Sequence, residues 1–329
     1  MYCQHKLHIL IKLKLKMIKM IKYYIHGVST AWKCVDNFFE LMLFRQGLKK
    51  ECVVKTKTLG EFHLKENPVK VSMINLILNF QSKFLNNNYV EEEIPIFKEF
   101  IKSLNENKDY VVLNGVKFEY NSEILVLFEY FSDMGNAPFE NIKNKIILDI
   151  GANIADTSLL FAKEGCEVYS YEPVPPTYKI ALKNISLNPE FGDNIHLFNQ
   201  AVSDKEGTIE IKFSSGSSLS SSIYSEDGES FEVECISLDK IVSNLKEEGK
   251  IPNLLHMDCE GSEFDIIPIS DLTIFEEVVI EHHQKMAGKD HRIILDVLDK
   301  QGFEIKNKIS WDDSTFEDIG IIHAVNKNK

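Results

Sequence analysis

The sequence predicts an α/β protein whose main domain is a Rossmann-like, doubly wound and mostly parallel sheet. From Ile146 onward, short apolar segments alternate with helical ones, the order expected of a parallel sheet with helices on both faces. Several apolar segments end in Asp or Glu, at the strand ends where such sheets bind ligands. We therefore expect this domain over residues 105–329, after a mostly helical extension with a hairpin over residues 1–104.

The main domain contains a regular succession of apolar strands and amphipathic helices. Strands are expected at residues 146–150, 167–172, 195–202, 208–213, 231–236, 253–258 and 277–282, and helices at residues 154–163, 176–188, 238–248 and 291–300. The segments FEIKN and IGIIHAV close the chain.

The N-terminal extension carries weaker signals. Helices are expected at residues 35–48, 71–84 and 94–104, with a hairpin around Gly60. A polar break from Asn105 to Asp109 marks the boundary, and Asn114-Gly115 is the turn signal of a second hairpin just beyond it.

Residues 8–24 form a basic amphipathic pattern, because Lys12, Lys16, Lys19 and Lys22 share one helical face. The lysines interrupt the apolar run, so the segment cannot span a bilayer. Three interpretations stay open: a docking helix packed on the rest of the chain, peripheral contact with an anionic membrane, or a true start at Met17 or Met20.

Charge and cysteine content exclude some classes of protein. The formal net charge is −13, which argues against a nucleic-acid partner because such partners need clustered basic residues. The six cysteines include no Cys-x-x-Cys pair, which is typical of reduced thiols in the cytoplasm. We therefore expect a cytoplasmic protein, in which any contact with a membrane would be peripheral and made through residues 8–24.

The first motif that could bind a ligand begins at Asp149, where a buried strand runs into a turn and a helix. Gly151 would let the backbone approach a ligand closely, and the helix N-terminus suits a carboxylate. Asp149 would bind a ligand ammonium or organise the turn. The plainer interpretation is a strand and a helix capped by Asp156.

The second motif is Glu172, which ends the next strand about 20 residues after Gly151, the spacing of a ribose-binding carboxylate. A carboxylate there accepts hydrogen bonds from both ribose hydroxyls. The plainer interpretation is a solvated turn residue beside prolines.

The third motif crowds Asp258, Glu260 and Glu263 into one loop after an apolar strand. Like charges held close raise one another's pKa, so Asp258 and Glu260 are candidates for the general base. Glu263 would instead stabilise the first turn of the next helix.

The fourth motif, Glu281-His282-His283, also ends a strand. Adjacent side chains of an extended strand point in opposite directions, so the two histidines cannot easily ligate one metal ion. We therefore predict no metal site. We expect one of these residues to face the substrate, with His282 as a candidate catalytic residue and His283 as its alternative.

Together these stretches resemble the FkbM family of S-adenosylmethionine-dependent methyltransferases. The resemblance covers about residues 140–285 and rests on ILDIGANIADTS (147–158), VYSYEPVPPTY (168–178), NQAVSDKEGTIEI (199–211), ISLDKI (236–241) and HMDCEGSEFDII (256–267).

The resemblance implies a seven-stranded methyltransferase core with an antiparallel last strand. It implies S-adenosylmethionine as cofactor, and transfer of a methyl group to a hydroxyl oxygen of a small molecule or glycan such as a sugar, glycolipid or polyketide. The residues it implies are Asp149, Gly151 and Asn153 for the cofactor, mainly its methionine part; Glu172 for the ribose; Gln200 and Ala201 for the adenine; and Asp258 and Glu260 beside the transferred methyl group.

One departure stands out, since the family usually has Gly where this chain has Ala155. Ala would be strained there if the residue needs a positive φ, and well suited if it is already helical. The property in doubt is therefore cofactor affinity rather than the fold. His256 replaces a commonly basic Lys, which is a milder change.

Two other functions compete with methyl transfer. A nicotinamide-dependent oxidoreductase needs G-x-G-x-x-G, but Asn153 and Asp156 stand where the second and third glycines belong. A non-catalytic protein that keeps the fold and binds a cofactor or glycan is the nearer alternative, and Ala155 is its best support. The Ser-rich stretch Ser214–Ser222 is either a flexible connection or a lid.

Overall fold

The computed structural model describes residues 32–67, 69–86, 91–106, 109–131, 139, 141–213, 229–310 and 319–329. The predictions for residues 8–24 and for Ser214–Ser222 lie outside these ranges. Contacts divide the chain into two compact units, residues 1–107 and residues 108–329.

The described residues of the first unit form helices and an antiparallel hairpin. A stacked aromatic pair, Phe80 and Phe97 at 4.1 Å between ring centroids, forms part of its core, and Phe62 meets Phe97 edge-on. Its elements are α2 (Phe38–Arg45), β1 (Glu51–Lys55), β2 (Glu61–Lys65), α3 (Lys70–Leu85) and α4 (Glu93–Asn105).

The second unit opens with a hairpin of β3 (Tyr110–Leu113) and β4 (Val116–Glu119), followed by the 3-10 helix η1 (Ser122–Phe131). Asn114 and Gly115 both have positive φ, 48° and 74°, which is the backbone of the two-residue turn that the Asn-Gly pair predicts.

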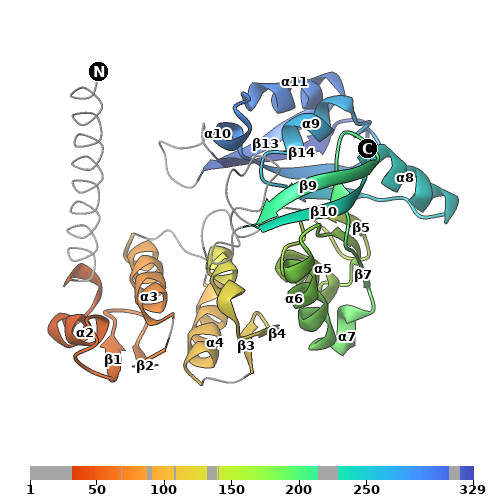
Figure 1. Ribbon diagram of the computed structural model, residues 1–329. Helices are drawn as coiled ribbons and strands as arrows, with labels where there is room; N and C mark the ends of the chain where they lie inside the picture. The colour runs from red at the N-terminus through yellow and green to blue at the C-terminus, as the bar shows by residue number, and fades with distance from the viewer. Residues whose placement is uncertain are drawn as a thin grey trace, which may run out of the picture. The chain divides into compact units, whose positions relative to one another are not determined.

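The centre of the second unit is a seven-stranded sheet in the order β13-β14-β12-β11-β5-β6-β7 (Figure 1). Strands β5, β6, β7, β11 and β12 are parallel, and β14 is antiparallel to both of its neighbours. This confirms the predicted α/β fold with an antiparallel last strand. The bounds are β5 (Ile146–Ile150), β6 (Glu167–Tyr171), β7 (Ile195–Phe198), β11 (Leu254–Asp258), β12 (Glu277–His282), β13 (Phe303–Ser310) and β14 (Gly320–Asn326).

Helices cover both faces of this sheet because its strands carry apolar side chains on both faces. Leu148, Met257 and Ile280 belong to the core that includes α8, α9 and α11. On the other face α5 packs, with Ser158 reaching Asp149 and Phe161 meeting His256 edge-on. The helices are α5 (Asp156–Lys163), α6 (Pro175–Ser186), α7 (Pro189–Gly192), α8 (Leu238–Glu247), α9 (Glu263–Ile266), η3 (Ile267–Ile269), α10 (Gln284–Ala287) and α11 (Arg292–Lys300).

A smaller sheet, in the order β8-β10-β9, joins β8 (Ala201–Val202), β10 (Glu229–Ile236) and β9 (Gly207–Phe213). The prediction of one strand over residues 195–202 was wrong, since that segment forms β7 and β8 with a break between them. Asn199 causes the break, because its side-chain amide donates to the carbonyls of Glu172 and Pro173, both at 2.9 Å.

The strand order reverses between β5 and β11. The chain runs from β5 outward to β6 and β7, and later returns to the other side of β5 as β11 and then β12. Loops leaving the carboxyl ends of β5 and β11 therefore diverge, and this is where open α/β sheets bind ligands.

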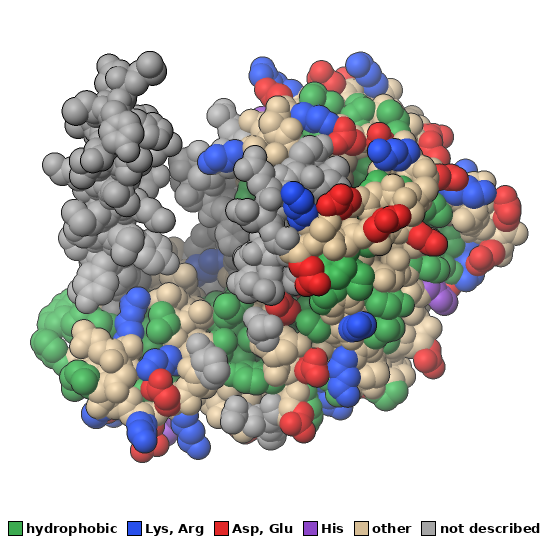
Figure 2. Space-filling model, viewed as in Figure 1, with side chains coloured by type: hydrophobic (Ala, Val, Ile, Leu, Met, Phe, Trp, Pro, Cys, Tyr) green, Lys and Arg blue, Asp and Glu red, His purple; other side chains and the backbone are tan. Residues whose placement is uncertain are grey.

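The surface of the second unit has no extended basic face in the view of Figure 2, where Lys and Arg side chains lie singly among Asp and Glu. Within the ranges that the structure describes, no helix is both long enough and apolar enough to cross a membrane.

Candidate active site

Two cavities open at the reversal point and share one wall. Counted together with the open solvent at their mouths, the first has a volume of about 710 Å³ and the second about 1260 Å³. Both are lined by Gly151, Asn153, Asp258 and Glu260, a set that we call the common wall. The common wall thus brings together four of the residues that the sequence predicts for the site, from the ends of β5 and β11.

Gly151 fits a space that no other residue can occupy. Its φ is +88°, and a Cβ atom added to it would lie 1.7 Å from the carbonyl oxygen of Asp258. Its amide and that of Ala152 donate to the carbonyl of Tyr171 at 2.9 and 3.0 Å. The sequence predicts that Gly151 lets a ligand approach the backbone. In the structure, the group that lies against Gly151 is the backbone of Asp258, at the end of β11.

Asp149 is fully buried and its carboxylate is engaged inside the protein. One oxygen accepts from the Ser158 hydroxyl, which lies 2.8 Å from the Ser170 hydroxyl, and the other lies 2.8 Å from Nδ1 of His256. Asp149 lines neither cavity, so of its two predicted roles the geometry favours organising the turn. Burial lowers the pKa of His256, but the bond to Asp149 outweighs it and raises the pKa above its ordinary value, which preserves a basic group at this position.

Glu172 follows the end of β6 and lines the first cavity. Its two carboxylate oxygens accept from the backbone amides of Asn153, at 3.0 Å, and Val174, at 2.7 Å. Burial raises its pKa to about 8, although the two amide donors oppose this shift. The carboxylate therefore ties the turn after β5 to the turn after β6, at the edge of the cavity.

The two residues predicted to hold adenine lie apart. Ala201 is buried and lines the first cavity beside Val202, Ile209 and Ile211. Gln200 lines neither cavity, and its side-chain amide donates to Glu234 at 3.2 Å. Gln200 precedes β8, and of these two residues only Ala201 lines the cavity.

Four carboxylates surround His283 beside the common wall. Its ring nitrogens lie 3.4 Å from Glu260, 3.6 Å from Glu281, 3.7 Å from Glu263 and 3.9 Å from Asp258. Burial lowers the pKa of His283, but Glu263, Asp258 and Glu260 outweigh it and raise the pKa to about 10. The pKa of Asp258 is also raised, by burial above all, against the lowering effect of His283 and His256.

Glu263 holds the loop after β11 against the end of β12, which is more than the helix-stabilising role that its position in the sequence predicts. It is fully buried, and its oxygens accept from the amides of Gly261, at 2.9 Å, and His283, at 2.5 Å. The loop after β11 is therefore fastened to the end of β12.

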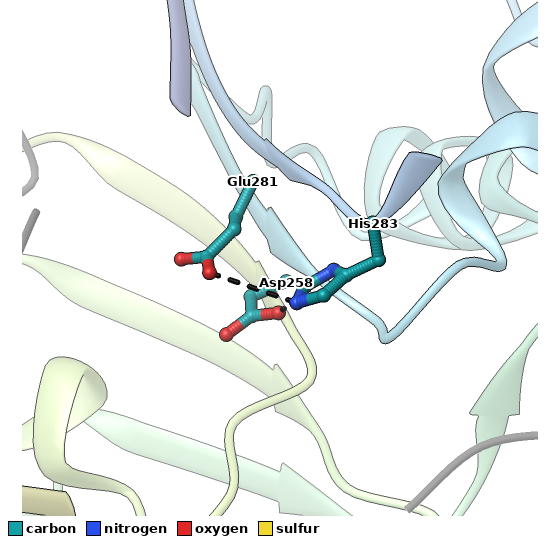
Figure 3. Close-up of side chains that lie close together, drawn as sticks. All are labelled: Asp258, Glu281 and His283. Atoms are coloured by element: carbon teal, nitrogen blue, oxygen red, sulfur yellow. Dashed lines mark ion pairs between the residues drawn. The ribbon is translucent and has the colours of Figure 1, made fainter. Parts of the chain in front are cut away.

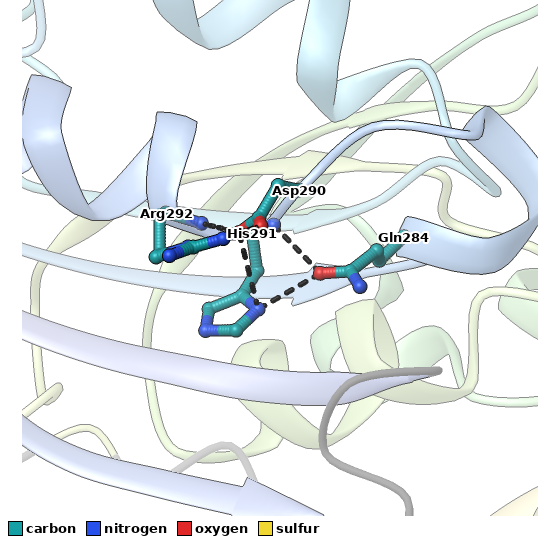
Figure 4. Close-up of polar contacts among 4 residues, drawn as sticks. All are labelled: Gln284, Asp290, His291 and Arg292. Carbon is teal, nitrogen blue, oxygen red and sulfur yellow. Dashed lines mark hydrogen bonds and ion pairs between the residues drawn. The ribbon is translucent and has the colours of Figure 1, made fainter.

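His282 lies on the face of β12 opposite to His283, as the strand geometry predicts. It is fully buried, it lines neither cavity, and its ring stacks on His291 at 5.2 Å. His291 is held by Gln284, whose side-chain oxygen lies 2.8 Å from the His291 amide and ring, beside an ion pair of Asp290 with Arg292 (Figure 4). Burial lowers the pKa of His282 to about 4. The structure thus brings His283, and not the candidate His282, to the site.

Ala155 has the left-handed backbone that the family's glycine would favour, with φ 62° and ψ 29°. It precedes α5 directly, so the alternative in which it is already helical is wrong. Its side chain is fully buried and lines neither cavity. The replacement of the usual Gly by Ala155 therefore adds backbone strain and removes no ligand contact.

We expect Ala155→Gly to leave the free energy of unfolding within about 1 kcal/mol of the wild-type value. Relief of the left-handed strain is worth roughly 1–2 kcal/mol. It is offset by about 0.8 kcal/mol for the buried methyl group and about 0.4–1 kcal/mol of unfolded-state entropy. Ala155→Val should instead destabilise by about 2–4 kcal/mol, because a β-branched residue disfavours positive φ and the site is full. Urea unfolding of the three proteins measures both, and a Val variant as stable as wild type would contradict the assignment.

Two acidic residues for which the sequence predicts no specific role in the site, Asp156 and Glu281, line the second cavity. Glu281 stands beside Asp258 only because β11 and β12 pair in that register. Asp156, interpreted as a helix cap, lies after the N-cap residue Ala155, and burial raises its pKa to about 7. The spacing of Glu281 and His283 could have predicted this position. They are two residues apart, so their side chains point to the same side of an extended chain.

Comparison with known proteins agrees with this geometry. The family model "Methyltransferase FkbM domain" matches residues 149–305, which run from the end of β5 to the start of β13 and include every residue of the common wall. None of the curated proteins compared matches the chain.

Several solved structures are similar. A methyltransferase FkbM from Methylobacillus flagellatus KT has 12% identity and a TM-score of 0.38, over 78% of this chain and 61% of that one. The Methanococcus jannaschii fibrillarin pre-rRNA processing protein has 12% identity and a TM-score of 0.40, over 68% of this chain and 84% of that one. The magnesium protoporphyrin IX methyltransferase from Synechocystis PCC 6803, solved with bound SAM, has 13% identity and a TM-score of 0.34, over 57% of this chain and 72% of that one.

This chain spans about three-fifths of the length of the Methylobacillus protein. The likeness to the family therefore rests on the matched domain, and the strand order and the common wall described above agree with it. The match over residues 149–305 supports the resemblance to the FkbM family of methyltransferases that the sequence motifs predict.

Proposed function

We propose that the second unit transfers a methyl group from S-adenosylmethionine to a hydroxyl oxygen of a small-molecule or glycan acceptor. The observation that carries this proposal is the common wall: two cavities meet at Gly151, Asn153, Asp258 and Glu260. Donor and acceptor bound on the two sides of such a wall would be adjacent, as a direct transfer requires.

The first cavity suits the adenosyl half of the cofactor. Glu172 offers carboxylate oxygens for the ribose hydroxyls, and Ala201, Val202 and Ile209 offer an apolar surface for the adenine. Asn153 adds a buried Oδ1 with no hydrogen-bond partner among the residues described, which leaves an acceptor for a ligand donor. The surrounding carboxylates favour the positive charge of a sulfonium ion.

The second cavity suits a polar acceptor with an apolar side. Asn114, Tyr130 and Asp156 supply polar groups, and Leu127 and Phe161 supply apolar surface. Such a mixture matches a sugar or a hydroxylated metabolite, which presents hydroxyl groups at its edge and C–H groups on its faces.

The chemistry is an in-line displacement. A bond forms between the acceptor oxygen and the methyl carbon while the bond from that carbon to sulfur breaks, which leaves S-adenosylhomocysteine and releases the hydroxyl proton. We propose Asp258 as the base that takes this proton, because it lines both cavities and has a raised pKa. Alignment of the two substrates would lower the barrier further, by at most about 7–11 kcal/mol.

We also propose a cytoplasmic location and no nucleic-acid partner. The net charge of −13 opposes binding to a polyanion. The five cysteines within the described ranges are all free thiols, which fits a reducing compartment.

Calorimetry tests the cofactor assignment. We expect S-adenosylmethionine to bind and NAD⁺ not to bind. Glu172→Ala should weaken the binding of S-adenosylmethionine by about 10- to 100-fold, since two hydrogen bonds to the ribose are lost. The control is Glu167→Ala, at the amino end of the same strand, where the carboxylate faces Lys250 and His196. Binding of NAD⁺ in place of S-adenosylmethionine would overturn the proposal.

Methyl transfer is tested with labelled S-adenosylmethionine and extracted cell glycans and lipids. We expect label in a product whose new methyl group is bonded to oxygen. Tight cofactor binding with no transfer to any fraction would support the non-catalytic alternative instead.

A further inference from the structure

We propose that Asp258, Glu281 and His283 bind one divalent metal ion, of the kind represented by Mn²⁺, on the acidic side of the common wall. This site shares Asp258 with the first cavity, but Glu281 and His283 do not line that cavity. The sequence predicts no metal there. That prediction considered two adjacent histidines as ligands, whereas the structure joins one histidine to carboxylates from two strands.

The three side chains converge from rigid positions. Asp258 ends β11, Glu281 lies in β12, and the two are paired directly in the register of the sheet. His283 follows β12 and points back to the same side, so the three side chains face one another (Figure 3). One donor atom from each lies within 4.8 Å of the other two. Donors bound at about 2.1 Å to one octahedral ion are about 3.0–4.2 Å apart, so small rotations would close the site.

Buried atoms in the cluster lack partners. The His283 side chain is only 6% exposed, yet its Nδ1 makes no hydrogen bond to any residue that the structure describes. The same holds for the buried Oδ1 of Asp258. Buried polar atoms are almost always satisfied, so two such atoms facing one site indicate a missing ligand.

A proton on His283 does not replace that ligand. A charge-assisted hydrogen bond to a carboxylate is about 2.7–2.9 Å long. The four contacts of the His283 ring are 3.4 to 3.9 Å, so none of them is such a bond. The four carboxylates lie near the imidazole, but none of them is at the distance of a charge-assisted hydrogen bond.

Charge points to a cation as well. Asp258, Glu260, Glu263 and Glu281 all lie within 4 Å of one imidazole, so even a protonated ring leaves a large negative excess. Such an excess is costly in a partly buried site unless a cation compensates it.

The ligand set suggests which ion binds. Two carboxylates and one imidazole suit an ion that accepts both oxygen and nitrogen and leaves coordination positions open, as Mn²⁺ does. Asp258 and Glu281 line the second cavity, so the open positions would face an acceptor. This last point rests on the proposed function: a bound ion would orient an acceptor hydroxyl and lower its pKa.

The test uses the full chain, stripped with EDTA and titrated with MnCl₂ in the absence of S-adenosylmethionine, with free Mn²⁺ measured by EPR. We expect one tight site per chain. Glu281→Gln should weaken it by about 10- to 100-fold or more, since the loss of even an outer-shell partner has that effect. The matched control is Glu277→Gln, on the same strand and face, whose carboxylate lies 3.1 Å from Nε2 of His323; it should bind Mn²⁺ as wild type does.

Pulsed EPR of the wild-type complex keeps the test valid if a variant folds poorly, because coupling of Mn²⁺ to a ring nitrogen should be visible without any substitution. Absence of tight binding, absence of nitrogen coupling, or equal weakening in both Glu variants would overturn the metal site. Calorimetry with S-adenosylmethionine on the EDTA-treated protein is independent of these results, so failure of the metal site and failure of the proposed function are told apart.

Discussion

Gly151→Ala should abolish folding of the second unit or destabilise it by more than about 4 kcal/mol, at the extreme end of single substitutions. The added Cβ would lie 1.7 Å from the carbonyl oxygen of Asp258 and 2.7 Å from its carbonyl carbon. Both are backbone atoms, so no side-chain rotation relieves the clash. The loops after β5 and β11 would have to separate, and with them the common wall.

Gly249→Ala is the control for this effect. Gly249 has a similar φ of +75°, but nothing lies within 4 Å of its added Cβ. It should lose only the cost of a left-handed alanine, about 1–2 kcal/mol. Urea unfolding and soluble yield measure both variants. A Gly151→Ala protein no less stable than Gly249→Ala would show that the loops are farther apart than the structure places them.

Asp258→Asn should lower the rate of methyl transfer by about 10²- to 10⁴-fold, the range of a lost general base. Asparagine keeps the shape of the side chain but cannot take the proton of the acceptor hydroxyl. The affinity for S-adenosylmethionine should change much less, because Glu172 and the apolar surface of the first cavity are untouched. Single-turnover rates and calorimetry on the same protein separate the two effects.

Asp265→Asn serves as the control for the base. Asp265 is in α9, close in sequence, but it is ion-paired with Lys289 and lines neither cavity. Its rate should equal that of the wild type. Glu281→Gln distinguishes loss of a base from loss of a bound cation, since Glu281 shares the metal cluster with Asp258 but lines only the second cavity. A fully active Asp258→Asn enzyme would exclude Asp258 as the base.

Much of the fold follows from local pattern. The alternation of apolar strands and helices predicts the parallel sheet, and the pair Asn114-Gly115 predicts its hairpin. Patterns fail where a tertiary contact decides the backbone. Asn199 breaks the expected strand because its side chain bonds to Glu172 and Pro173, residues far away in the sequence. Nothing local to residues 195–202 reveals that bond.

The site was predictable to the level of strand ends but not of side-chain direction. The positions of Gly151, Glu172 and Asp258 follow from where the strands stop. The inward face of Ala201, and the choice of His283 over His282, depend on strand register, which needs the partner strand. Likewise the sequence leaves two conformations open for Ala155, and only the contacts around it select the left-handed one.

The contact of Gly151 with Asp258 also has a consequence for how the domain matures. These residues lie at the ends of adjacent strands of the sheet, with Gly151 directly after β5 and Asp258 the last residue of β11. They are far apart along the chain, with β6, β7 and the smaller sheet between them. Contacts of such long sequence separation form late in folding, because the loop entropy must be overcome first. The common wall, and with it both cavities, would therefore be acquired in a single late step. Ligand affinity would then serve as an all-or-none reporter of completed folding, and a growing chain that ended before β11 would bind neither partner.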